Sequence, residues 1–334
     1  MTATLGNDLA VPLCDARPRL ARWQRWLSLR AYGVFTSTLF AAATPPHRMR
    51  RRFERFGAVS RAALQGRHPG LKFDDHACGR VAIEGVRAVE VPRCTILYLH
   101  GGAYVMGSPA SYRNRAMRLG YRCRAEVFVP DYRLAPEHPF PAALEDAHAA
   151  WRHVVALGPD RPLFVAGDSA GGGLALALLL QLRQRGEALP QGAILLSPWT
   201  DLSVSGASVE TNRRQDLWLS REHLEHWASY SVGRADARHP LASPAFADLS
   251  GLPPLLILAG EHEVLLDDAL RAAAAARRGG TEVQVHIGPG MQHDWPLTLP
   301  WLDESRYAWE LISRFVEPNA LPNTSSARGG VESW

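Results

Sequence analysis

The chain has 334 residues, of which 46% are hydrophobic and 21% charged, which is typical of a soluble globular protein and predicts one catalytic domain with appended helices. Its formal net charge is +4, but the basic residues are nearly all arginines spread along the chain, so nucleic-acid binding is not expected. The only lysine, Lys72, follows no glycine-rich loop, which excludes a phosphate-binding P-loop and a Schiff-base lysine.

Four cysteines lie far apart in the sequence, with no Cys-x-x-Cys pair: Cys14, Cys78, Cys94 and Cys123. Neither a disulfide framework nor a zinc site is therefore expected, and the thiols are predicted to be free. The N-terminus lacks the charged start, apolar core and cleavage site of a signal peptide, and no run of about 18 apolar residues occurs. We expect a cytoplasmic protein with no integral membrane segment.

Residues 19–66 carry aromatic and aliphatic side chains at helical spacing and contain no strand-like run, which predicts two or three helices. Arginines between residues 48 and 55 interleave with Met49, Phe53 and Phe56. This pattern is typical of a helix with one solvated side, and the alternative of a membrane-surface helix lacks a lipid anchor or a second membrane signal. We assign residues 1–80 to an N-terminal helical segment.

From Val81 onward, short β-branched runs alternate with helical stretches, the pattern of an α/β domain with a mostly parallel sheet flanked by helices. The predicted strands are short and largely apolar, as strands buried on both faces must be, and lie at 95–99, 127–130, 163–166, 193–196, 255–259 and 283–287. The predicted helices between them include 142–157, 171–185, 265–278 and 302–316. The catalytic domain thus spans residues 81–318, with a lid-like insertion at 203–236 and a disordered tail at 319–334.

The motif G-x-S-x-G at residues 167–171 lies between a predicted strand and a predicted helix. In this context the glycines allow a tight, strained turn that lifts the serine side chain out of the sheet. The same letters also occur in ordinary Gly-Ser turns, but the placement between a strand and a helix favours a nucleophile. Ser169 is therefore the predicted nucleophile.

The segment His-Gly-Gly-Ala at residues 100–103 follows the first predicted strand. An enzyme with such a serine turn needs backbone N–H groups there to stabilise a negatively charged intermediate, and bulky side chains would block the approach. The alternative is a plain Gly-Gly turn. We expect Gly101, Gly102 and Ala103 to form this oxyanion hole together with the N–H of Ala170, next to the nucleophile.

A serine hydroxyl needs a base, nearly always a histidine oriented by a carboxylate, and the chain order for this fold is serine, acid, histidine. Thirteen histidines compete for this role. Others lie inside a strand (His286), before the serine (His138) or in the lid-like insertion (His223 and His226). Because His293 follows the last predicted strand on a loop, it is the predicted base.

Two carboxyls qualify as the acid on their placement in loops after strands, from which a carboxylate can reach an imidazole. Glu263 follows the fifth predicted strand, and Asp201 follows the fourth. Asp267 and Asp268 lie one turn into the next helix. These positions leave both Glu263 and Asp201 open.

One short helix predicted in the insertion carries three potential metal ligands close together: His223, Glu225 and His226. Without the spacing H-E-x-x-H they are weak evidence for zinc. We expect a solvated face of the lid there, and neither a metal nor a cofactor.

The chain resembles the bacterial hormone-sensitive lipase family of esterases, which have the α/β-hydrolase fold. The resemblance covers residues 91–316 and rests on the segments 97–103, 131–143, 167–172, 263–268 and 290–293, of which DYRLAPEHPFPAA at 131–143 is highly specific. It implies a helical cap formed by the N-terminal segment, Glu263 as the acid, and oxyanion donors at Gly102, Ala103 and Ala170. The family usually has a third glycine at Ala103 and Asp-Pro at Glu263 and Val264, where this sequence departs from it.

We therefore predict a carboxylesterase in which Ser169, Glu263 and His293 form a catalytic triad and water releases an acyl-enzyme intermediate. The resemblance and the methyl group of Ala103 favour short acyl chains. The predicted partners are a small-molecule ester and water. The sequence leaves open a lactone, amide or carbamate hydrolase, a homodimer, and a non-catalytic small-molecule receptor on the same fold.

Overall fold

The computed structural model of the chain describes residues 11–12, 27–31, 33, 36, 44–158 and 160–317. Within them, the strands form one nine-stranded sheet in the order β1-β9-β8-β7-β6-β4-β5-β3-β2. The strands are β1 (Val11–Pro12), β2 (Lys72–Cys78), β3 (Val81–Arg87), β4 (Cys94–Leu99), β5 (Ala125–Pro130), β6 (Leu163–Asp168), β7 (Gly192–Leu196), β8 (Leu255–Gly260) and β9 (Val283–Gly288). The predicted tail, Cys14 and most of residues 19–43 lie outside the described residues.

The strands from β4 to β9 pair in parallel with one another, which confirms the predicted α/β class. β4, β7 and β8 are buried at every position. Strands covered by helices on both faces must be apolar throughout, which is why they stood out as continuous hydrophobic runs. All six predicted strands are present, and their ends lie within two residues of the expected ones.

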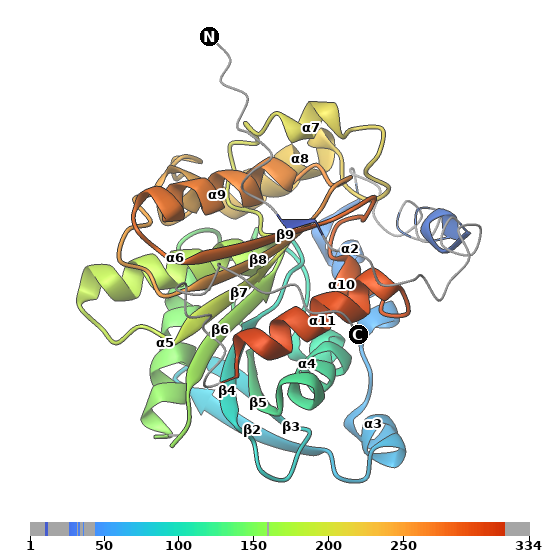
Figure 1. Ribbon diagram of the computed structural model, residues 1–334, viewed down its shortest axis with the longest axis vertical. Helices are drawn as coiled ribbons and strands as arrows, with labels where there is room; N and C mark the ends of the chain where they lie inside the picture. Colours follow the sequence, from blue (N-terminus) through green and yellow to red (C-terminus); the bar gives the residue numbers. More distant parts are fainter. Residues whose placement is uncertain are drawn as a thin grey trace, which may run out of the picture.

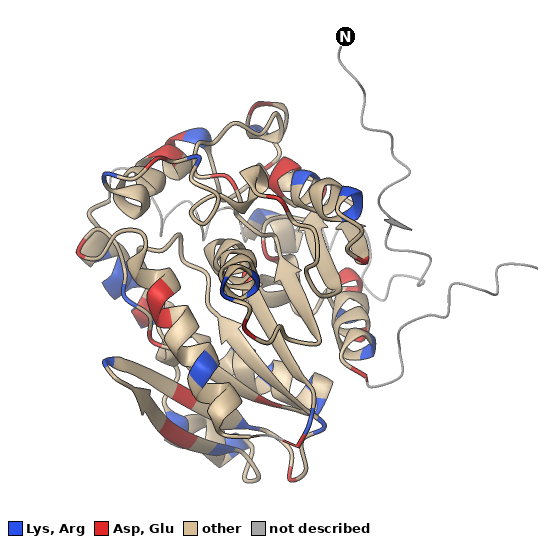
Figure 2. Ribbon diagram, turned by 90° about the vertical axis from the view of Figure 1, so that its left-hand side faces the viewer, with Lys and Arg blue, Asp and Glu red and all other residues tan. Residues whose placement is uncertain are grey.

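The edge formed by β2 and β3 was not predicted as sheet. β2 pairs antiparallel with β3 along seven residues, and β3 pairs antiparallel with β5. β2 lies at the edge, where its charged residues are solvated, so no apolar run marked it (Figure 2). The predicted boundary at residue 80 is therefore wrong, because β2 belongs to the sheet of the catalytic domain.

Helices cover both faces of the sheet (Figure 1). α5 (Ala142–Ala156), α6 (Ala170–Arg185) and α9 (Leu266–Arg278) pack on one face, and α4 (Pro109–Cys123) and α11 (Asp303–Phe315) pack on the other. The four predicted helices are present with ends within one residue of expectation. α4 was missed because arginines recur along it and obscure its apolar face.

The remaining helices come from the N-terminal segment, the insertion between β7 and β8, and the chain after β9. They are α2 (Pro46–Gly57), α3 (Arg61–Arg67), α7 (Ser208–Thr211), α8 (Arg221–Val232), the short 3₁₀ helix η2 (Pro244–Phe246) and α10 (Trp295–Thr298). α2 and α8 pack with loops beyond the carboxyl ends of the strands in one apolar cluster, which includes Met49, Val105, Trp199 and Trp227. Among the described residues, no helix is both long and apolar enough to span a bilayer.

Candidate active site

Ser169 lies in the turn between β6 and α6, with φ 52° and ψ −122°. A residue with a side chain rarely adopts a positive φ, so this turn persists only because its surroundings impose it. A Cβ atom on Gly171 would lie 2.0 Å from the carbonyl oxygen of Leu99, and one on Gly167 would lie 2.3 Å from that of Gly171. These close approaches require glycine at both positions, as the motif predicted.

Glu263 and His293 come from the loops after β8 and β9 and form a buried pair. His293 Nδ1 lies 2.7 Å from Glu263 Oε2, and the Gly260 N–H donates to Glu263 Oε1 at 2.8 Å. The two side chains are 1% and 0% exposed, so water does not screen their interaction. A carboxylate at Nδ1 favours the tautomer with its hydrogen there, which leaves Nε2 able to accept a proton. Ser169 and His293 line the same pocket.

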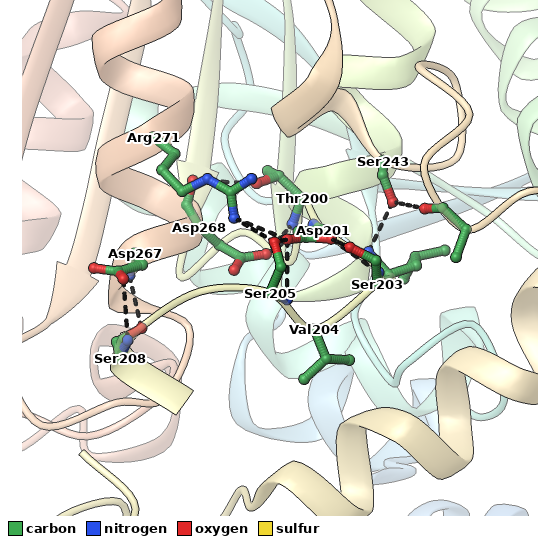
Figure 3. Close-up of polar contacts among 12 residues, drawn as sticks. Thr200, Asp201, Ser203, Val204, Ser205, Ser208, Ser243, Asp267, Asp268 and Arg271 are labelled. Atoms are coloured by element: carbon green, nitrogen blue, oxygen red, sulfur yellow. Dashed lines mark hydrogen bonds and ion pairs between the residues drawn. The ribbon is translucent and has the colours of Figure 1, made fainter. Parts of the chain in front are cut away.

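Asp201, the other acid that the sequence left open, is engaged elsewhere (Figure 3). Its carboxylate oxygens accept hydrogen bonds from the hydroxyls of Ser203 and Ser205, each at 2.5 Å. Arg271 of α9 donates to its Oδ2 at 2.8 Å. Burial alone would raise the pKa of Asp201, but the serine hydrogen bonds and the Arg271 guanidinium outweigh it and lower that pKa. Asp201 therefore anchors the start of the insertion as a carboxylate.

Asp267 and Asp268 also join α9 to the insertion. Asp268 Oδ2 accepts from the N–H groups of Thr200 and Asp201 at 2.7 and 2.8 Å, and Asp267 Oδ2 accepts from the Ser208 N–H at 3.0 Å. Burial and the charge of Asp201 raise the pKa of Asp268 to about 8. Of the four candidate carboxyls, Glu263 is the one that contacts His293 within the described chain.

The loop after β4 contributes residues to the same pocket. Gly102 and Ala103 line the pocket, and their φ angles are 114° and 56°. The N–H groups of Gly102, Ala103 and Ala170 have no acceptor within the described part of the chain. Gly101 departs from the prediction, because its N–H donates to Asp168 Oδ1 at 3.0 Å. Three of the four expected donors therefore remain for an oxyanion.

Asp168, which the sequence analysis did not single out, ties this loop to the serine turn. Besides the Gly101 N–H, it accepts hydrogen bonds from the hydroxyls of Tyr98 and Tyr112, each at 2.8 Å. Burial and the Asp168 charge raise the pKa of both tyrosines well above the ordinary value, so both stay as donors. The place of Asp168 inside G-x-S-x-G was the one sequence feature that could have indicated its contact with the loop after β4. Asp168 thus positions the loop through its hydrogen bond to the Gly101 N–H.

The pocket that Ser169 and His293 line has an apolar wall and a polar corner. The wall is built from the N-terminal helix, the insertion and the loops after β4 and β7, and consists of Phe53, Met106, Trp199, Trp218, Leu219, Leu224 and Trp227. Arg115, Asp294 and Thr298 form the corner. The sequence could not indicate this wall, since its members come from four separate segments of the chain that only the fold brings together.

Asp294 is a second carboxyl beside the predicted base. Its Oδ2 lies 3.3 Å from His293 Nε2, and its side chain is 4% exposed. Burial alone would lower the pKa of His293, but Asp294 and Glu263 outweigh it and raise that pKa to about 9. Burial raises the pKa of Asp294 well above the ordinary value, against the opposing effect of the His293 imidazolium. The two groups therefore compete for a proton at His293 Nε2.

The histidines of the insertion hold no metal-like arrangement. His223 Nδ1 lies 2.8 Å from the hydroxyl of Ser220, the N-cap residue of α8, and Glu225 pairs with Arg221 at 3.2 Å. Residues 44–158 and 160–317, with the shorter described pieces before them, contain no group of three potential metal ligands.

The chain is similar to a known protein family and to several known proteins. Residues 96–297 match the model of a family with the alpha/beta hydrolase fold. The chain is 45% identical over 239 residues to an acetyl-hydrolase of Streptomyces hygroscopicus, an alignment covering 71% of this chain and 80% of the relative. The solved structure of the esterase EstE5 soaked with p-nitrophenyl butyrate is 36% identical, with a TM-score of 0.78, and the match covers 86% of this chain and 96% of EstE5.

A second solved structure, an esterase from the bacterial hormone-sensitive lipase family, superposes with a TM-score of 0.77 at 35% identity and covers 87% of this chain and 97% of its own. The family match spans more than half of the chain, and these relatives are matched over most of their length. This chain therefore belongs to the hormone-sensitive lipase family of α/β-hydrolases and is a carboxylic ester hydrolase.

Proposed function

We propose that the enzyme cleaves esters by two-step acyl transfer through Ser169. His293 Nε2 takes the hydroxyl proton as the serine oxygen attacks the ester carbonyl, and Glu263 stabilises the imidazolium. His293 then gives this proton to the departing alcohol, and water activated by His293 releases the acid from the serine. The proposal rests above all on the buried 2.7 Å contact between His293 and Glu263 in the pocket that Ser169 lines.

The oxyanion of each tetrahedral intermediate would be stabilised by the N–H groups of Gly102, Ala103 and Ala170. Donors that are already oriented in a site with little water need no reorganisation when the charge develops, so they stabilise the transition state strongly. The absence of competing acceptors for these three groups within the described residues supports the assignment.

We further propose short acyl esters as the substrates. The methyl group of Ala103 adds bulk beside the oxyanion position, and tryptophans 199, 218 and 227 restrict the pocket wall. The similarity to an acetyl-hydrolase and to EstE5, which was soaked with p-nitrophenyl butyrate, supports the same substrate class.

A panel of p-nitrophenyl esters tests this substrate class. We expect kcat/KM to be highest between the acetyl and butyryl esters and to fall by about tenfold or more for the dodecanoyl ester, because a long chain must displace the aromatic wall. Lactones, anilides and aryl carbamates of matched size serve as alternative substrates in the same assay. An optimum at long acyl chains, or higher kcat/KM for any alternative class, would contradict the proposal.

Asp294→Asn should shift the pH dependence of kcat/KM toward lower pH. A general base works unprotonated, so activity is present above the pKa of His293, about 9, and is lost as the pH falls through it. Removing the Asp294 carboxyl lowers the pKa of His293, so the acid limb of the kcat/KM profile moves to lower pH. Glu310→Gln is the matched control, because it removes an exposed carboxylate on α11. It should leave the pH dependence of kcat/KM unchanged. Superimposable profiles for wild type and Asp294→Asn would show that Asp294 does not tune the base.

A further inference from the structure

The segment 101–106, here called the oxyanion loop, is held from outside by several elements. Four consecutive carbonyl oxygens each accept a hydrogen bond: Gly102 from the N–H groups of Val105 and Met106 (3.0 and 2.9 Å), Ala103 from the Ser231 hydroxyl (3.1 Å), Tyr104 from the Ala135 N–H (2.9 Å) and Val105 from Arg50 Nε (2.7 Å). The donors outside the loop belong to α8, to the segment after β5 and to α2. The carbonyl oxygens of residues 102–105 are thus all bonded, while the N–H groups of Gly102 and Ala103 have no acceptor among the described residues.

The loop needs this support because its backbone is strained. Ala103 and Tyr104 are consecutive residues with side chains, and their φ angles are 56° and 60°. Such conformations relax unless the surroundings over-determine them. Relaxation would rotate the peptide planes and turn the N–H groups of Gly102 and Ala103 away from the pocket. The contacts on the carbonyl side therefore decide whether an oxyanion hole exists.

Arg50 of α2 makes the most connections among these outside donors. Its Nε donates to the Val105 carbonyl, and its Nη2 donates to the Ala135 carbonyl at 2.6 Å. Ala135 in turn holds Tyr104 through its own N–H, so one guanidinium bonds both the loop and the segment that supports it. The ion pair of Arg50 with Glu137 is half exposed on the glutamate side and contributes little by itself.

The rest of α2 fits the same arrangement. Met49 is fully buried in the apolar cluster that contains Ala103 and Val105, and Phe53 lines the catalytic pocket. Glu54 accepts a hydrogen bond from the Ser108 hydroxyl at 2.9 Å, just beyond the loop. Together with Arg50, these three residues of α2 contact the oxyanion loop, a residue just beyond it or the pocket.

We propose that Arg50 is a positioning residue for the oxyanion hole, through which the N-terminal helix α2 supports the chemical step. This inference rests on the proposed acyl-transfer function. Arg50 touches no reacting atom and acts through the backbone of residues 102–105.

Arg50→Ala should lower kcat for p-nitrophenyl butyrate by about tenfold or more, with KM changed less than about twofold, because the loss falls on a site complementary to the transition state. Arg50→Lys should recover part of kcat, since an ammonium can donate to a carbonyl but cannot match the fork of the guanidinium. Arg51→Ala removes the exposed arginine next to it on α2 and serves as the matched control, expected to keep wild-type kcat.

Inhibition by a trifluoromethyl ketone separates positioning from general stability. The enzyme-bound hemiketal places an oxyanion in the hole, so its Ki should rise in Arg50→Ala by the same factor by which kcat falls, while KM stays near wild type. Ser231→Ala removes a second side-chain donor to the loop, a hydroxyl 3.1 Å from the Ala103 carbonyl and 2.8 Å from the Trp227 carbonyl, and should change kcat and Ki in the same direction. It tests the inference independently if Arg50→Ala does not fold.

Wild-type kcat and Ki in Arg50→Ala would overturn the inference, as would a loss of kcat that Ki for the ketone does not follow. If Arg50→Ala is unfolded, unchanged kcat and Ki in Ser231→Ala would overturn it. Failure of the acyl-transfer proposal has a different signature, because Ser169→Ala would then remain active whatever the behaviour of Arg50.

Discussion

Ser169→Ala should abolish ester hydrolysis and leave the fold intact. Without the hydroxyl no acyl-enzyme can form, and losses of about 10⁶-fold in kcat are typical when such a nucleophile is removed. The turn should survive, because the side chain of Ser169 caps no helix and alanine is the smaller residue at the same φ. The measurements are p-nitrophenyl butyrate turnover, the intact mass after an acid quench, which should show a butyryl adduct in wild type alone, and thermal unfolding.

Ser229→Ala is the control for this experiment. Ser229 lies exposed on α8 with its hydroxyl bonded to the His226 carbonyl, so its loss should leave turnover and the butyryl adduct unchanged. Near-wild-type turnover in Ser169→Ala, or an adduct that persists in it, would assign the nucleophile to another residue.

Glu263→Gln should lower kcat by about a thousandfold or more. Glu263 accepts on both oxygens, from the Gly260 N–H and from His293 Nδ1. Glutamine keeps one acceptor, so either the Gly260 N–H or the imidazole loses its partner. With the amide nitrogen toward His293, the imidazole carries its hydrogen on Nε2 and can no longer deprotonate Ser169. Steady-state kinetics of the purified variant, with circular dichroism to verify folding, provide the measurement.

Asp201→Asn is the informative comparison for the acid. It weakens the contacts to Ser203, Ser205 and Arg271 and should lower the unfolding temperature. Most of the turnover should remain, since Asp201 anchors the insertion and does not contact the base within the described residues. A far larger loss of kcat in Asp201→Asn than in Glu263→Gln would contradict the assignment of the acid.

The sequence alone was sufficient for features whose cause is local. Strands buried on both faces are largely apolar, so β4, β7 and β8 could be recognised without reference to any other part of the chain. The turn around Ser169 requires glycine at Gly167 and Gly171 because backbone atoms approach within van der Waals contact there, and this requirement is visible as a motif. The placement of His293 after the last strand followed from the order of the elements.

Features that depend on contacts between distant segments were decided by the tertiary structure. Glu263 and Asp201 both follow strands, and only the direction of each side chain shows which one reaches His293. Gly101 loses its place among the oxyanion donors because Asp168, 67 residues away, takes its N–H. β2 is polar because it lies at an edge, a position that strand order sets and local pattern does not. Arg50 lies 55 residues from Val105 and 85 residues from Ala135 in the sequence. The packing of α2 against the loops beyond the carboxyl ends of the strands brings its guanidinium within hydrogen-bond distance of both carbonyl oxygens, and no spacing along the chain encodes these contacts.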